Sequence, residues 1–511
     1  MPSRCDELAR RQQWLSARAI DAQRDGTLGA HFVFRHALYR QVFYQRIGAL
    51  ARARWHRSVA ESMARSRGTG IDASAAELAM HHELGHDVPA ALRQYADAAE
   101  AALRRFAPAE AMSLTTHALA LLPQCPDGGE KLELEMALLG PRTVASSHVV
   151  GVTAPETLAA YERVEVLSDQ VPLKARALEA GTGWAHYVRG EYDQAWSRAE
   201  QLHTTAQQRG DRMLRVAACN LSGAVASYRG ELTAARDWLQ RGIEEAAGVT
   251  EHLATSLTVV DLEVSLRSRF SQVLAHLGEI DAARAQIAAA NERARRLAPY
   301  ALRLVQIFEG FLEARLEHHE RVQALAESIR RLADEHGIAQ AGGTSRWLRG
   351  LALARLGQPT EGHALIVEGY AIDERIGVMR GRSGVLGYAV DALVLAGRWA
   401  DAQRELDAAL ALAQRLGERL HLPDLLLLQG RIALGLRDAP AARAAMQAAR
   451  DEAQRQQALW LELTACAALC GLDEATDADF AALAAARARL REGSQEALPV
   501  RVDALLAQRA H

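Results

Sequence analysis

The sequence predicts an all-α protein in which pairs of helices repeat as a right-handed α-solenoid, and the main evidence is a regular spacing of glycine. Glycine falls every 20 residues from Gly337 to Gly417 and again from Gly190 to Gly230. The residue that follows a helix often adopts the left-handed conformation, which costs a side chain about 1–2 kcal/mol and costs glycine almost nothing. The spacing therefore indicates a helix, a turn, a second helix and another turn, with one helix pair in about 40 residues.

Small residues at a fixed offset are the second observation. Ala or Gly lies five residues after each glycine in the middle of a repeat, and also after Arg437, which replaces one such glycine. These residues are Ala195, Ala235, Ala283, Gly362, Ala402 and Ala442. A small side chain lets the second helix of a pair approach the first closely. Since the period is slightly longer than the ~34 residues of a tetratricopeptide repeat (TPR), we expect a TPR-like array.

Composition and charge narrow the class of protein. Apolar residues make up 49% of the 511 residues but aromatic residues only 5%, which favours closely packed aliphatic helices over a β-sandwich. The formal net charge of −3 gives no overall attraction to nucleic acid. The N-terminus lacks the apolar core of a signal peptide, and apolar runs stay well short of the ~18 residues of a membrane span. We therefore expect a cytoplasmic protein.

Residues 1–66 are expected to form a winged-helix-like module. A short helix leads into the strand-like segment WLSARAI, and a turn at Asp25-Gly26 precedes HFVFRH, whose alternating Phe32 and Phe34 suit a second strand. Two amphipathic helices follow, over HALYRQVFYQRI and ARARWHRSVAESMARS. The arginines of this region fall on several faces, so we expect packing of the module rather than DNA binding.

Several segments resemble one family of known proteins. GTLGAHFVFRHALYRQVFYQRI and AELAMHHELGHDVPAALRQYADAAEAALRRFAPAEAMSLTTHALALLP resemble the winged helix and first helical repeats that follow the nucleotide-binding domain of bacterial STAND-type signalling ATPases. GPRTVASSHVVGVTAPETLAAYERVEVL and GERLHLPDLLLLQGRIAL resemble later parts of the same proteins, so the resemblance runs from about residue 5 to about residue 437. It implies a regulatory arm that works with an ATPase and, commonly, with cyclase, kinase or DNA-binding effector domains.

The chain departs from this family in one respect, because it has no P-loop. A P-loop requires GxxxxGK[ST], in which backbone N–H groups and the lysine hold the phosphates. Neither Lys131 nor Lys174 lies in such a motif. We therefore expect that the nucleotide-binding half is absent, that no cofactor is bound, and that the protein partner is a separate ATPase or cyclase subunit. The resemblance implies that His36, in FRHAL, approaches the β-phosphate of ADP on that subunit; the alternative is a histidine packed or hydrogen-bonded locally.

The segment HELGH, from His82 to His86, is a complete HExxH motif. On a helix both imidazoles would share one face and bind zinc, and Glu83 would activate a zinc-bound water. A third ligand is not evident, since the metzincin extension would require glycine and histidine where the chain has Pro89 and Leu92. Gly85 and Pro89 also indicate that the helix ends here. We therefore expect no metal at His82, Glu83 and His86.

Four segments are expected along the chain. They are the winged-helix-like module (1–66), the entry helices with the first TPR-like pair (67–125), the TPR-like array (126–437) and divergent capping helices (438–511). Within the array, GPRTVASSHVVGVT is expected to be irregular, and about eight extra residues separate Gly230 from Gly278.

Nothing in the array indicates catalysis, so we expect a non-enzymatic protein-interaction or sensor scaffold. Trp184, Tyr187 and Tyr228 lie toward the ends of first helices, where TPR-like arrays line a concave groove. They are candidate contacts for a ligand, and the alternative is that they are aromatic wedges between repeats. Three other functions stay open: a zinc hydrolase at HELGH, a winged-helix transcription regulator, and a truncated gene product with no independent role.

Overall fold

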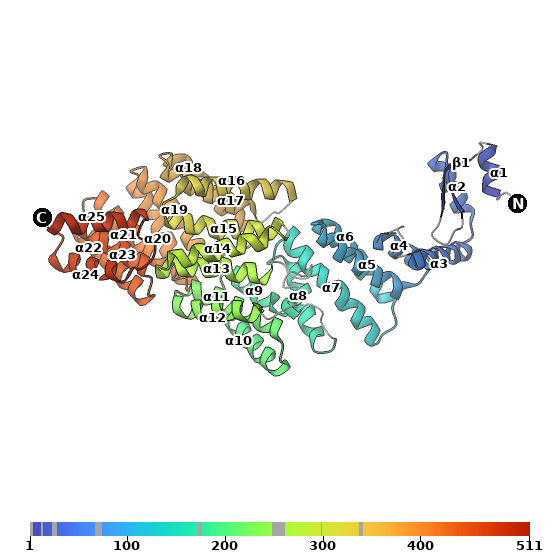
Figure 1. The fold of residues 1–511 in the computed structure, drawn as a ribbon, viewed down its shortest axis with the longest axis horizontal. Helices are drawn as coiled ribbons and strands as arrows, with labels where there is room; N and C mark the ends of the chain where they lie inside the picture. Colours follow the sequence, from blue (N-terminus) through green and yellow to red (C-terminus); the bar gives the residue numbers. More distant parts are fainter. Residues whose placement is uncertain are drawn as a thin grey trace. The chain divides into compact units, whose positions relative to one another are not determined.

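The computed structural model describes residues 4–11, 14–22, 28–66, 74–171, 176–247, 261–297, 299–336 and 341–510. These residues form 25 α-helices, two short 3-10 helices and one two-stranded sheet (Figure 1). This confirms the predicted TPR-like α-solenoid with a small β-hairpin near its N-terminus. Gly337, the Asp25-Gly26 turn and most of the expected insertion after Gly230 lie outside the described residues. Within the described ranges, none of the helices combines the length and hydropathy that a membrane crossing requires.

The chain divides into two compact units, which do not coincide with the four segments predicted above. The first is Met1–Ala101 with Ser113–Leu138, and the second is Ala102–Met112 with Leu139–His511. The boundaries of the four segments stay predictions.

The first unit contains the hairpin and the first short helices. Its elements are α1 (Arg4–Arg10), β1 (Leu15–Ala22), β2 (Leu28–Phe34), α2 (Ala37–Arg46), α3 (Ala49–Ser66), α4 (Ala75–Leu84) and the 3-10 helix η1 (Leu122–Gln124). Three helices extend across the division, namely α5 (Val88–Arg104), α6 (Pro108–Leu121) and α7 (Gly129–Val149).

The two strands pair as predicted, but the hydrophobic core of the first unit is formed by helices. β1 and β2 are antiparallel, with Leu15 opposite Phe34 and Ala22 opposite Leu28. A small aliphatic core forms where α4, α5, α6 and α7 meet, around the fully buried Leu92 and Leu138. The hairpin is thus confirmed, whereas the assignment of the module as a winged helix stays a prediction.

The second unit holds the repeat array. Its helices are α8 (Pro155–Ser168), η2 (Arg176–Ala180), α9 (Gly181–Val188), α10 (Tyr192–Arg209), α11 (Arg212–Tyr228), α12 (Leu232–Ala247), α13 (Leu262–Leu277), α14 (Ile280–Ala294), α15 (Pro299–Arg315), α16 (His319–His336), α17 (Ala341–Arg355), α18 (Pro359–Arg375), α19 (Arg382–Leu395), α20 (Trp399–Leu416), α21 (Leu422–Gly435), α22 (Ala439–Arg455), α23 (Leu459–Cys470), α24 (Asp477–Arg489) and α25 (Ala497–Ala510).

The glycine spacing and the small residues have the predicted roles. Every described glycine of the 20-residue series has a positive φ, and Arg437 keeps that conformation at φ 64° without a glycine. The six small residues five positions later are all buried. At Gly362 the approach is too close for any side chain, since an added Cβ would lie 2.5 Å from the carbonyl oxygen of Gly350. A larger side chain at such a position would push the two helices of a pair apart.

One expectation about the array is wrong, because GPRTVASSHVVGVT is largely helical. Its first ten residues, including Pro141, continue α7 to Val149. A proline inside a helix removes one hydrogen bond and costs about 3 kcal/mol. The residues on either side offset that cost, since Leu138, Leu139, Val144 and Ala145 are all buried.

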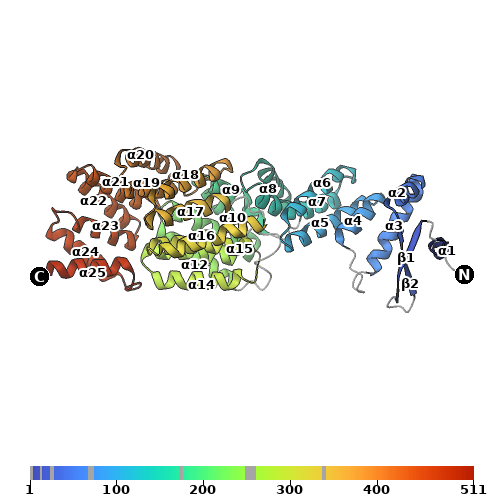
Figure 2. The same ribbon diagram turned by 90° about the horizontal axis from the view of Figure 1, so that it is seen from above.

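The array also folds back on itself, which the sequence pattern did not predict. The carbonyl oxygen of Val188 accepts hydrogen bonds from the backbone N–H of Met379 and Arg380 at 2.8 and 3.0 Å. One repeat later, the carbonyl oxygen of Tyr228 accepts from Arg419 and Leu420 at 2.8 and 3.3 Å. Further along, Glu492 accepts from the first N–H groups of α14. The loop that follows α24 therefore lies against the start of α14, and α23 packs against α13; α24 is red in Figures 1 and 2.

Two glycines of the series separate the cost of the left-handed turn from the cost of this close approach. Gly230 (φ 77°) lies against the later part of the array, so that an added Cβ would be 3.0 Å from Cβ of Arg419 and 3.1 Å from Cδ of Gln456. Gly397 (φ 70°) has nothing within 4 Å of an added Cβ. Alanine at either position would lower the free energy of unfolding by about 1 kcal/mol, because it must adopt the left-handed conformation.

We expect Gly230→Ala to lower the free energy of unfolding by about 1–3 kcal/mol more than Gly397→Ala does, because only Gly230 meets packed atoms. Urea denaturation followed by circular dichroism measures both variants. Equal losses at the two positions would contradict the contact between Gly230 and the later repeats.

Candidate functional site

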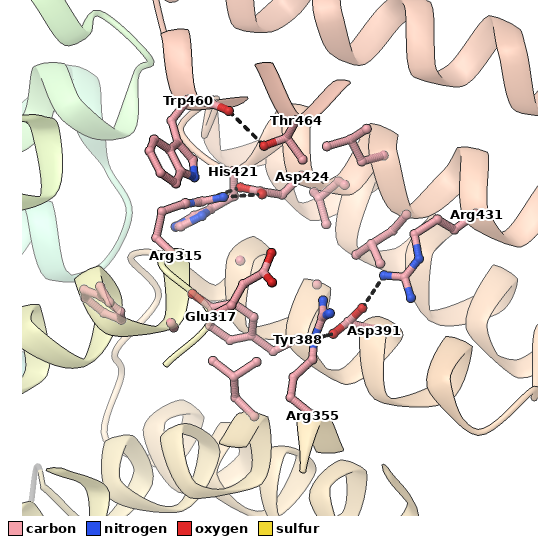
Figure 3. Close-up of a pocket in the computed structure, with 18 of the residues that line it drawn as sticks. Arg315, Glu317, Arg355, Tyr388, Asp391, His421, Asp424, Arg431, Trp460 and Thr464 are labelled. Atoms are coloured by element: carbon pink, nitrogen blue, oxygen red, sulfur yellow. Dashed lines mark hydrogen bonds and ion pairs between the residues drawn. The ribbon is translucent and has the colours of Figure 1, made fainter. Parts of the chain in front are cut away.

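The second unit contains a partly open cavity of about 310 Å³ among the first helices of successive repeats. Its wall is built mainly from α15, α17, α19, α21 and α23 (Figure 3). Apolar side chains form much of the lining: Phe311, Leu351, Leu425, Leu427, Leu428, Met446, Trp460 and Leu498. Charged side chains from four of these helices, α15, α17, α19 and α21, also line it, and these give the cavity its chemistry.

Two arginines of the wall share a single carboxylate. Asp391, on α19, is 5% exposed. Its Oδ2 lies 2.7 Å from Nε of Arg355, and its Oδ1 lies 2.5 Å from Nη1 of Arg431 (Figure 3). Arg355 is the last residue of α17, and Arg431 lies on α21. The two guanidinium groups carry two positive charges against one negative charge, and each side chain keeps 36% of its surface exposed.

A second ion pair in the wall is complete by itself. Arg315 donates to both carboxylate oxygens of Asp424, at 2.7 and 3.0 Å. Burial alone would raise the pKa of Asp424, but the charge and hydrogen bonds of Arg315 outweigh burial and lower that pKa. Nη2 of Arg315 also lies 3.4 Å from Nε2 of His276.

His276 is held as a neutral acceptor beside this pair. Burial, with a smaller effect of Arg315, lowers the pKa of His276 to about 3. Its Nδ1 lies 2.8 Å from the carbonyl oxygen of Gln272, which can only accept, so Nδ1 carries the proton. Nε2 is therefore free of hydrogen and accepts from Arg315.

The other titratable groups of the wall are paired or neutral. Glu317 accepts from both Nη atoms of Arg501, at 2.6 and 2.7 Å. Burial lowers the pKa of His319 and of His421, so both rings are uncharged at pH 7. Nδ1 of His319 is buried and, among the described residues, has no hydrogen-bond partner. The six charges of the lining, three arginines and three carboxylates, sum to zero. Because Glu317 is paired with Arg501, which lies outside the lining, one excess positive charge is left at Arg355, Asp391 and Arg431.

A smaller cavity of about 40 Å³ adjoins the larger one and shares four lining residues with it: Phe311, Gly384, Tyr388 and His421. Asp373 lies in its wall and accepts from the indole N–H of Trp347 at 3.1 Å. Burial raises the pKa of Asp373 to about 6, although Trp347 and nearby arginines, including Arg380 and Arg382, oppose the shift. The carboxyl group is thus partly protonated near neutral pH.

The three aromatic residues predicted as ligand contacts lie side by side in the interior. Tyr187 is fully buried, and Tyr228 is 5% exposed. The rings of Trp184 and Tyr187 pack edge to face at 5.3 Å, and those of Tyr187 and Tyr228 at 5.7 Å. Arg269 lies over Trp184 and Tyr187 and donates to the Tyr187 hydroxyl at 2.8 Å. This packing is what aromatic wedges between repeats would make, and a role in ligand binding stays a prediction.

The HELGH segment does not form one helical face. α4 ends at Leu84, and His86 follows in the left-handed conformation at φ 56°. Glu83 accepts from the Tyr95 hydroxyl at 2.6 Å and lies 2.8 Å from Nε2 of His117. These hydrogen bonds outweigh burial and lower the pKa of Glu83. Across the described ranges, no three His, Cys, Asp or Glu side chains are placed to hold a metal ion.

His36 lies at the start of α2 and caps it. Its Nδ1 accepts from the backbone N–H of Leu38 at 3.2 Å, and its ring packs edge to face against Tyr39 at 6.1 Å. A side chain at this position satisfies one of the free N–H groups of the helix. Contact with the phosphate of ADP on another subunit stays a prediction.

The charged residues of the cavity were missed in the sequence, although the repeat contains a signal for them. Arg315 and Arg355 are 40 residues apart, and so are Asp391 and Arg431. Residues one repeat apart occupy equivalent places on their helices and face the same interior. Charged residues recurring at that distance on otherwise apolar first helices would have indicated the site.

The fold defines this chain as a TPR-like α-solenoid protein. No family profile and no curated protein matches the sequence. The structural matches include a Rap protein complexed with Competence and Sporulation Factor (TM-score 0.45, 11% identity, 82% of this chain and 99% of that chain). Others are aspartyl phosphate phosphatase F from Bacillus subtilis (0.37, 12%, 81% and 93%) and yeast Tom70 (0.29, 13%, 88% and 99%). None of these tests the resemblance to STAND-type ATPases.

Asp373 provides a prediction about stability and pH. Its pKa is about 6 in the folded protein and about 3.9 in an unfolded chain, so the folded state binds the proton more tightly. The contribution of this proton to stability is complete below about pH 4 and is lost as the pH rises through 6.

Asp373→Asn keeps an acceptor for Trp347 and removes the buried charge. We expect the free energy of unfolding to rise at pH 7 by on the order of 2 kcal/mol and to change little at pH 4. Urea denaturation at the two pH values measures this. A variant that is no more stable than the parent at pH 7 would show that the carboxylate is not disfavoured there.

Proposed function

We propose that this protein is a non-enzymatic sensor scaffold, the regulatory arm of a STAND-type signalling system that acts on a separate P-loop ATPase subunit. In this proposal the hairpin with α2 and α3 docks onto the ATPase, and the solenoid carries the surface that receives a signal. The observation that supports docking is the exposure of α2 and α3.

α2 has no buried residue, although six of its ten residues are apolar or aromatic. Leu38 is 59% exposed, and on α3 Leu50 and Trp55 are 67% and 60% exposed. Val33, Tyr39, Val42, Tyr44 and Val59 are also among the exposed large apolar side chains. Isolated helices shorter than ~12–15 residues are marginal in water, and exposed apolar patches mark interaction sites. A protein partner that covers α2 would supply the missing burial.

The charge of this region supports the kind of partner. Residues 28–66 contain seven arginines and one acidic residue, Glu61. A protein surface with an apolar centre and an acidic rim would complement both features. DNA would engage the arginines but would leave the exposed Leu38, Leu50 and Trp55 in water, so the winged-helix transcription regulator is the weaker alternative.

Photocrosslinking in the native cell tests the proposal. We expect p-benzoylphenylalanine at Leu38 or Trp55 to crosslink to a P-loop ATPase, identified by mass spectrometry. The same amino acid at Val367 on α18, which is 45% exposed, serves as the matched control and should not give that product. A crosslink to DNA, a crosslink only to a second copy of this chain, or no product specific to residues 38 and 55 would contradict the proposal.

A further inference from the structure

We propose that the 310 Å³ cavity of the second unit is the site that receives the signal, and that it binds a small organic monoanion, a carboxylate with an apolar body. Arg355 and Arg431 would hold the carboxylate, and the leucine and tryptophan side chains of the wall would cover the rest. The inference rests on the proposed sensor role, which it makes specific by naming the class of signal.

The first argument is the charge that the protein leaves unbalanced. Asp391 neutralises one of the two guanidinium groups that it contacts. The other two ion pairs, Arg315–Asp424 and Glu317–Arg501, are each neutral. Each of the two guanidinium side chains keeps 36% of its surface exposed, so solvent screens part of this excess charge, and an anion bound in the cavity would neutralise it directly. A single negative charge on the ligand completes the balance at Arg355, Asp391 and Arg431.

The second argument is the hydrogen-bonding capacity of the two arginines. A guanidinium has five N–H donors. The ion pairs with Asp391 are made at Nε of Arg355 (2.7 Å) and at Nη1 of Arg431 (2.5 Å). Both arginines line the cavity, Arg355 from α17 and Arg431 from α21, so their other N–H donors are on side chains of the cavity wall. A planar carboxylate accepts two parallel N–H bonds from a guanidinium, which fixes both its position and its orientation.

The third argument is the size and character of the remaining wall. Cavities of about 300–1,000 Å³ hold small molecules, and apolar walls with a few polar groups provide affinity and orientation. Leu425, Leu428 and Trp460 give such a wall beside the charged group. The two histidines of the wall are neutral and the acidic groups are paired, so the cavity offers a divalent anion only one excess positive charge and offers a cation none.

Calorimetric titration of the full-length protein with two carboxylates tests the ligand class and separates two sources of the same chemistry. Octanoate represents a free acid, and acetyl-leucyl-leucine represents the carboxyl terminus of a peptide. We expect saturable one-to-one binding of at least one of them, and at least tenfold weaker binding of the neutral counterparts, octan-1-ol and acetyl-leucyl-leucinamide. Failure of both acids to bind at 10 mM, or equal binding of the neutral compounds, would overturn the proposal.

Two variants place the binding in the cavity. Arg431→Gln leaves Asp391 paired with Arg355 and removes the excess charge, so we expect at least a tenfold loss of affinity for the carboxylate. Arg404→Gln makes the same change on α20, at a side chain that is 74% exposed, and should leave the affinity unchanged. If Arg431→Gln is unfolded by circular dichroism, Arg355→Gln replaces it on the same reasoning. Unchanged affinity in the folded variant would overturn the assignment.

The titration tests the cavity and the crosslinking tests the docking surface, so either proposal can be contradicted while the other stands. Octanoate and the peptide acid are measured on the purified chain and need no ATPase. Loss of carboxylate binding with crosslinking intact at Leu38 would remove the cavity from the account and keep the docking. Carboxylate binding without the crosslink at Leu38 would keep the cavity as a ligand site and remove the docking onto an ATPase.

Discussion

The carbonyl oxygens of Val188 and Tyr228 accept hydrogen bonds from backbone N–H groups 191 residues further along the chain (379 − 188 and 419 − 228). In most solenoids each repeat contacts only its neighbours, and stability is close to a sum of local terms. Here the early repeats also bind the later ones. The buried carboxylate of Glu418 reinforces the contact, since it accepts from the Tyr192 hydroxyl, the Gly381 N–H and the Ser383 hydroxyl. A local array thereby becomes one closed unit.

Closure explains why charged groups lie in the interior. The first helices of the repeats turn their inner faces toward one another, so Arg355 and Arg431 line a cavity, while each keeps 36% of its side chain exposed. Ion pairs in such surroundings are screened less than on the surface, and an unbalanced charge there favours an anionic ligand. Arg315 differs from these two arginines, because its charge is neutralised by Asp424 and it also donates to the neutral His276. The proposed signal site depends on this difference between the two arginine clusters.

The sequence predicted the local structure well and the long-range structure poorly. The glycine series and the small residues such as Ala235 and Ala402 report on turns and on neighbouring helices, and these features are local in the chain. Contacts such as Gly230 with Gln456 depend on the accumulated rotation of many repeats, which no short pattern encodes. The cavity was missed for another reason, since its charged residues, such as Arg355 and Asp391, lie on first helices of neighbouring repeats and recur at the repeat distance, a pattern that was not used. GPRTVASSHVVGVT, expected to be irregular, is largely helical because the burial around Pro141 offsets the cost of a proline inside α7.

A double-mutant cycle between Tyr192 and Glu418 tests the closure most directly. Their side chains meet at 2.5 Å although they are 226 residues apart. Tyr192→Phe, Glu418→Gln and the double variant would be compared by urea denaturation. A closed array predicts a coupling free energy of about 1–3 kcal/mol, because the hydrogen bond joins a hydroxyl to a buried charge. Additive effects, with a coupling below about 0.3 kcal/mol, would show that the early and late repeats do not meet in solution.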